Sequence, residues 1–159
     1  MCRLKTNKGY ILLEAVFSII LLSLVLSFIF SMEMRNINLK KYNLEINKYA
    51  EFLEGLKNTL IFNKTYEDIK NIAYEGENLN DESCATKKLY INNENINLDV
   101  LKNKEFSEII TFEKPNKLPY LEIKVHGEPN NVIKLNLNLI FRLVDETNNI
   151  STSFYKGDY

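Results

Sequence analysis

The sequence predicts an α+β protein in which a long amino-terminal helix, transmembrane in its first half, packs on an antiparallel β-sheet. Three observations predict this class. Residues 15–32 carry no charged side chain. From residue 39 to residue 60, apolar side chains recur at alternating spacings of three and four, the period of a helix with one apolar face. Beyond residue 88, short runs alternate between apolar and polar residues, as half-buried strands do.

Composition excludes several classes of protein. The chain has 159 residues, of which 45% are hydrophobic and 26% charged, so it is not collagen-like, mucin-like or broadly disordered. Its net charge of −1 gives no reason to expect non-specific nucleic-acid binding. Cys2, Cys84 and His126 are the only cysteines and histidine, too few for a disulfide framework, a His-based triad or a multi-His metal site. We expect no enzymatic activity, no metal and no cofactor.

The amino terminus is predicted to anchor the chain in the cell membrane. Residues 1–9 contain Arg3, Lys5 and Lys8 and no acid, so they are expected to stay cytoplasmic. Residues 10–32 are apolar apart from Glu14 and serines, and as a helix they span roughly 35 Å, enough for the ~30 Å hydrocarbon core. No small-residue cleavage site follows this segment, so removal by the general signal peptidase is not expected.

Glu14 is the unusual residue of this segment. A carboxylate inside a membrane helix costs about 2.5–3.5 kcal/mol on insertion scales, so it either lies shallow, at the headgroups, or has a cationic partner. Cleavage after Gly9 would create a new amino terminus at Tyr10. Such an amine could pair with Glu14 of a neighbouring chain and neutralise both charges.

The run Lys8-Gly9-Tyr10-Ile11-Leu12-Leu13-Glu14-Ala15, followed by an apolar helix, resembles the signal of type IV prepilins. This family includes pilins, type II secretion pseudopilins and competence pseudopilins. The resemblance covers about residues 1–35. The sequence departs from the family pattern at Tyr10, where Phe is usual, and at Ile11, where Thr or Ser is usual.

The resemblance implies that a prepilin peptidase cleaves between Gly9 and Tyr10 and N-methylates Tyr10, and that Glu14 pairs with the Tyr10 amine of an adjacent subunit. The implied partners are other pilin or pseudopilin subunits, the peptidase, an inner-membrane assembly platform and membrane lipid. The implied role is that of a minor pilin or pseudopilin in an extracytoplasmic, pilus-like (fimbrial) filament serving secretion, DNA uptake, adhesion or motility. Loss of the leader gives a mature charge of −1 − 3 = −4, so direct nucleic-acid binding is not expected.

The alternative interpretation is a signal-anchored, single-pass membrane protein whose exported domain binds a ligand. In that case residues 1–9 persist in the mature protein.

The helix is predicted to continue past the membrane segment, from residues 10–33 into an amphipathic part at residues 34–62. Seven residues form its apolar packing stripe: Leu39, Tyr42, Ile46, Tyr49, Leu53, Leu56 and Leu60. The stripe has no regular flanking charge pairs, which favours packing on the chain's own sheet over a homodimeric coiled coil.

Residues 63–159 are predicted to form a β-rich globular domain. Thr65 and Asp68 have the spacing of a capping box that begins a short helix. Residues 75–88 are expected to be a loop. Strands are expected near residues 89–91, 96–100, 108–112, 121–125, 133–143 and 150–155, joined as an antiparallel meander.

Other candidates for chemistry have ordinary interpretations. The acidic pairs Asp81-Glu82 and Asp145-Glu146 are interpreted as solvated loop charges, because calcium-loop spacing is absent. Cys84 is interpreted as a free thiol, and His126 as a solvent-facing strand residue.

Overall fold

The computed structural model describes residues 8–74, 86–128, 131–143 and 146–158. It confirms the α+β class, with a long amino-terminal helix and a five-stranded antiparallel sheet. The chain divides into two compact units, one ending at Leu44 and the other beginning at Glu45. Helix α1, Lys8–Asn58, contributes to both.

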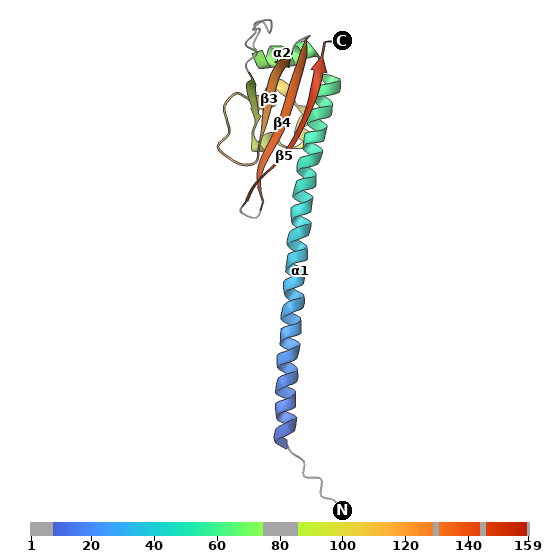
Figure 1. Ribbon diagram of the computed structural model, residues 1–159, viewed down its shortest axis with the longest axis vertical. Helices are drawn as coiled ribbons and strands as arrows, with labels where there is room; N and C mark the ends of the chain where they lie inside the picture. Colours follow the sequence, from blue (N-terminus) through green and yellow to red (C-terminus); the bar gives the residue numbers. More distant parts are fainter. Residues whose placement is uncertain (1–7, 75–85, 129–130, 144–145, 159) are drawn as a thin grey trace, which may run out of the picture. The chain divides into compact units, whose positions relative to one another are not determined.

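The first unit consists of the amino-terminal part of α1 (Figure 1). No proline interrupts it, and every described side chain from Tyr10 to Lys41 is exposed. One segment of this helix is long and apolar enough to cross a membrane, and none of that segment is buried. In this it differs from the core helix of a soluble domain, which is mostly buried.

The second unit is built around the sheet, whose strand order is β2-β1-β3-β4-β5 with every neighbouring pair antiparallel. The strands are β1 Lys87–Ile91, β2 Ile110–Thr111, β3 Tyr120–Glu128, β4 Val132–Leu143 and β5 Glu146–Gly157. Strands β3 and β4 alternate strictly between buried and partly exposed residues, as expected when one face of a sheet covers a core.

The carboxy-terminal part of α1 supplies the other side of this core. The ring of Tyr49 packs on Phe141 of β4 with centroids 4.7 Å apart, and Phe52 is only 1% exposed. A π-helical turn, Thr59–Asn63, ends the helix. There the Lys156 Nζ of β5 donates a hydrogen bond of 2.6 Å to the carbonyl oxygen of Ile61.

Helix α2, Tyr66–Tyr74, begins with the predicted capping box. The Thr65 hydroxyl accepts from the Asp68 backbone N–H at 3.1 Å, and the Asp68 carboxylate accepts from the Thr65 N–H at 2.8 Å. These hydrogen bonds, the backbone one first, hold the pKa of Asp68 below its usual value. Burial of Ile69 and Ala73 fixes the inward face of the helix.

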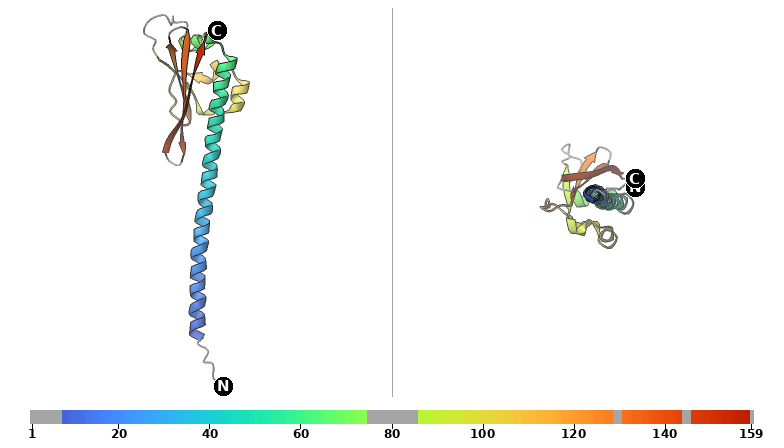
Figure 2. Two further views of the ribbon diagram at one scale, coloured as in Figure 1. Left: turned by 45° about the vertical axis from the view of Figure 1, so that its right-hand side comes forward. Right: turned by 90° about the horizontal axis from the view of Figure 1, so that it is seen from below.

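The strand predicted at residues 96–100 is wrong. A 3-10 turn, Asn93–Asn95, and helix α3, Leu98–Asn103, occupy this region. The Asn97 side chain accepts from the Asp99 N–H at 3.1 Å and so caps α3. Helix α3 approaches α1 at Gly55, where an added Cβ would lie 2.7 Å from the Leu98 Cδ2. The end of α1 therefore lies between the sheet and α3 (Figure 2).

Two further boundaries differ from the expected ones. Residues 108–112 are mostly not a strand: helix α4, Phe106–Ile109, buries an apolar pair spaced three apart, and only Ile110–Thr111 join the sheet. The last strand starts at Glu146 rather than residue 150, because it pairs with β4 along its whole length. Residues 75–85 of the predicted loop lie outside the described residues, and residues 87–88 belong to β1.

Candidate functional site

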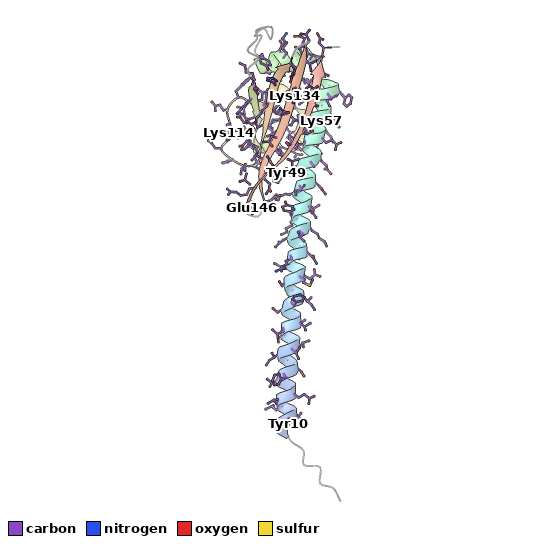
Figure 3. All side chains as sticks on the ribbon, viewed as in Figure 1. Tyr10, Tyr49, Lys57, Lys114, Lys134 and Glu146 are labelled. Atoms are coloured by element: carbon purple, nitrogen blue, oxygen red, sulfur yellow. The ribbon has the colours of Figure 1, made fainter. Side chains whose placement is uncertain are left out.

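The candidate processing site lies at the start of α1. Arg3 and Lys5 lie outside the described residues, whereas Lys8 and Gly9 are the first two residues of the helix. The Gly9–Tyr10 bond therefore lies within the first turn. Tyr10 follows with 74% of its surface exposed (Figure 3).

Glu14 lies on the same face of α1 as Tyr10, because residues four apart are neighbours on a helix. The Ser18 hydroxyl donates a hydrogen bond of 2.8 Å to the backbone carbonyl oxygen of Glu14. The Glu14 carboxylate takes no part in this hydrogen bond. Within the described part of the chain, no lysine, arginine or histidine forms a salt bridge with this carboxylate. The side chain is exposed among apolar residues.

The packing stripe divides into three groups by burial. Tyr49, Leu53, Leu56 and Leu60 are buried in the second unit, Tyr42 and Ile46 are half-buried, and Leu39 is 59% exposed. Sequence reasoning missed Phe52, whose spacing of four residues from Leu56 was the available signal. The buried face is thus wider than a coiled-coil seam, as expected for a helix covering a sheet.

Side chains that could hold a metal ion do not gather in the described part of the chain. No group of three or more His, Cys, Asp or Glu side chains could hold a metal ion there. His126 is half-buried on β3, with its Nδ1 3.3 Å from the Thr86 hydroxyl oxygen. Cys84, Asp81-Glu82 and Asp145 lie outside the described residues, and Glu146 is exposed at the start of β5.

No protein-family model, curated protein or solved structure matches this chain significantly.

Proposed function

We propose that this chain is a structural subunit, a minor pilin or pseudopilin, of a type IV pilus-like filament. Prepilin peptidase removes residues 1–9, Tyr10 becomes the N-methylated amino terminus, and the subunit assembles through the apolar part of α1. The observation that carries the proposal is the Glu14 carboxylate, which forms no salt bridge with any described residue. It lies four residues after Tyr10 on a helix whose apolar surface is exposed on all sides.

An apolar helix of this kind needs an apolar environment both before and after assembly. The membrane supplies it first, and the packed helices of neighbouring subunits supply it in the filament. Leaving lipid for a helix bundle therefore costs little hydrophobic free energy, because lipid tails and leucine side chains are similarly apolar.

The Glu14 charge gives that bundle its register. An isolated carboxylate in the membrane costs about 2.5–3.5 kcal/mol. A cationic amine about 4 Å away contributes about 4 kcal/mol at an effective dielectric constant of about 20. The two terms are of similar size, so pairing Glu14 with the Tyr10 amine of another subunit offsets the cost of the charge. A subunit displaced along the bundle loses this pair.

The second unit suits the outside of such a filament. Its buried residues are apolar, and no polar or charged residue is buried among those that the structure describes. Side chains on the solvent-facing side of β3 and β4 include lysine, glutamate and asparagine. A hydrated face of this kind is compatible with exposure outside the cell and with lateral contacts between subunits.

Mass spectrometry of the membrane fraction tests the processing step. We expect a mature chain that begins at Tyr10 and carries one added methyl group on its amine. Gly9→Val should block the cut because the side chain obstructs the peptidase, whereas Lys8→Gln keeps the glycine and should still be processed. Native protein that retains residues 1–9 would refute the proposal and support the signal-anchored alternative.

Filament incorporation of Glu14→Ala tests the charge pair. Loss of about 1.4 kcal/mol lowers an equilibrium tenfold, so we expect incorporation to fall at least about tenfold while membrane insertion persists. Glu33→Ala is the matched control, because Glu33 is an exposed acid on the same helix, beyond the apolar segment. Normal incorporation of Glu14→Ala would contradict the pairing mechanism even if processing is found.

A further inference from the structure

The solvent-facing side of the sheet contains a hollow of about 660 Å³, within the range of about 300–1,000 Å³ that small-ligand sites occupy. Antiparallel register places Asn136 opposite Ser153 and Asn138 opposite Ser151. These residues share one face of β4 and β5, because side chains two apart along a strand point the same way. We call this site the polar hollow; its outward residues are Lys124, Asn136, Asn138, Asn149, Ser151 and Ser153.

The charges at the polar hollow favour an uncharged ligand. Lys124 is the only ionisable residue among the described residues that line it, and the Lys124 Nζ lies 3.6 Å from the Glu122 carboxylate. The other outward groups are amides and hydroxyls, which both donate and accept hydrogen bonds. An anion would have to compete with Glu122, and a cation would meet Lys124.

One atom of the polar hollow lacks a hydrogen-bond donor. The Asn138 Oδ1 is shielded from solvent and has no partner among the described residues. A shielded amide oxygen without a donor is uncommon in native proteins and costs about 1–3 kcal/mol. A ligand with hydroxyl or amide N–H groups supplies the missing donor when the Asn138 side chain turns this oxygen toward the hollow.

An exposed aromatic ring stands beside this row of polar groups. Tyr155 follows Ser153 on the same face of β5 and is 59% exposed. The Lys134 Nζ lies 5.5 Å from the centre of its ring, a cation–π contact that steadies the ring. Figure 3 marks the position of Lys134 on the sheet. A flat ring next to amides and hydroxyls offers both a stacking surface and hydrogen bonds.

We propose that the polar hollow binds a neutral glycan, with a sugar ring stacked on Tyr155 and its hydroxyl groups hydrogen-bonded to the amides and hydroxyls of β4 and β5. Sugars combine an apolar C–H face with closely spaced hydroxyls, which matches this arrangement. The site is separate from the assembly helix, so its occupation does not depend on the proposed filament function.

The test uses the full-length, ¹⁵N-labelled chain in phosphocholine detergent, which avoids detergents with sugar headgroups. Cellohexaose and chitohexaose are the two uncharged probes. We expect saturable chemical-shift changes at the side-chain amides of Asn136, Asn138 and Asn149 with at least one of them. Absence of saturable change with both probes at millimolar concentration would overturn the proposal, as would changes confined to another face.

Substitutions at the polar hollow and at the neighbouring Tyr155 separate glycan binding from self-association of the chain. Asn138→Ala and Tyr155→Ala should each weaken binding at least about tenfold, whereas Asn71→Ala, an exposed asparagine on α2, should leave it unchanged. Far-ultraviolet circular dichroism checks that each variant is folded. If Asn138→Ala does not fold, Tyr155→Ala still tests the proposal. Shift changes at the polar hollow that follow protein concentration without glycan would instead show a second copy covering this face, and would refute the proposal.

Discussion

Replacing Leu56 with alanine tests which part of the amphipathic helix is bound to the sheet. Leu56 is 0% exposed, whereas Leu39, a member of the same packing stripe, is 59% exposed. Truncation to alanine removes three carbons, worth about 2.4 kcal/mol at ~0.8 kcal/mol per buried group. A cavity that only partly collapses adds about 1 kcal/mol. We therefore expect Leu56→Ala to lower the free energy of unfolding by about 3 kcal/mol.

Thermal unfolding of the full-length chain in detergent measures this effect. Near-ultraviolet circular dichroism is a suitable probe, because the chain has nine tyrosines and no tryptophan. A loss of about 3 kcal/mol corresponds to a fall in Tm of roughly 10–20 °C for a domain of about a hundred residues. Leu39→Ala, the matched control, should cost less than about 1 kcal/mol. Equal effects of the two changes, or a loss below about 1 kcal/mol for Leu56→Ala, would refute the assignment of the core.

Three further predictions concern local interactions of the second unit. Burial raises the pKa of Tyr49 above its usual value of 10.0. The contribution of the neutral phenol to folding stability is therefore intact below about pH 10 and is lost as pH rises through the raised value. Between pH 8 and pH 11, the free energy of unfolding should fall less for Tyr49→Phe than for the unchanged protein, as denaturation at the two pH values would measure. Thr65→Ala removes a capping hydrogen bond and should cost about 1 kcal/mol in urea unfolding. Because the pKa of Asp68 is lowered, its carboxylate stabilises the fold at neutral pH and this stabilisation is lost on acidification. Thr65→Ala should therefore also make the free energy of unfolding depend less on pH in the acidic range. Gly55→Ala places a Cβ 2.7 Å from the flexible end of Leu98. This contact largely offsets the gain in helix propensity of about 1 kcal/mol, so the free energy of unfolding should change by less than about 1 kcal/mol. Gly55→Val should be clearly destabilising.

Long periodic patterns predicted the main elements of the fold. The alternation from Ile133 to Leu143 locates β4, because eleven residues in sequence are enough to separate a period of two from one of 3.6. The apolar helix and the capping box at Thr65 could also be predicted, because each is defined by residues that lie close together in the sequence. Such local signals can be interpreted without knowledge of tertiary contacts.

Short patterns were ambiguous for a physical reason. Residues 96–100 alternate like a strand, yet Asn97 caps a helix and Leu98 packs at Gly55 of α1. Five residues fit either period, so tertiary contacts decide between them. The spacing of Leu98 and Leu101, together with a capping asparagine before them, was the signal for the helix.

The two candidate sites differ in how far the sequence reveals them. Tyr10 and Glu14 are one helical turn apart, so their relation follows from spacing alone. The polar hollow depends on the pairing of Asn138 with Ser151, two residues from different strands. Strand register is a property of the assembled sheet, and no local pattern marks either residue as part of a site.

The hydrogen bond from Lys156 to the carbonyl oxygen of Ile61 joins residues separated by 95 positions. This hydrogen bond can therefore form only after the intervening strands have been synthesised and β5 has joined the sheet. During translation the emerging helix is without this hydrogen bond. Closing such a long loop is entropically costly before its contacts are made, so we expect slow maturation of the globular unit.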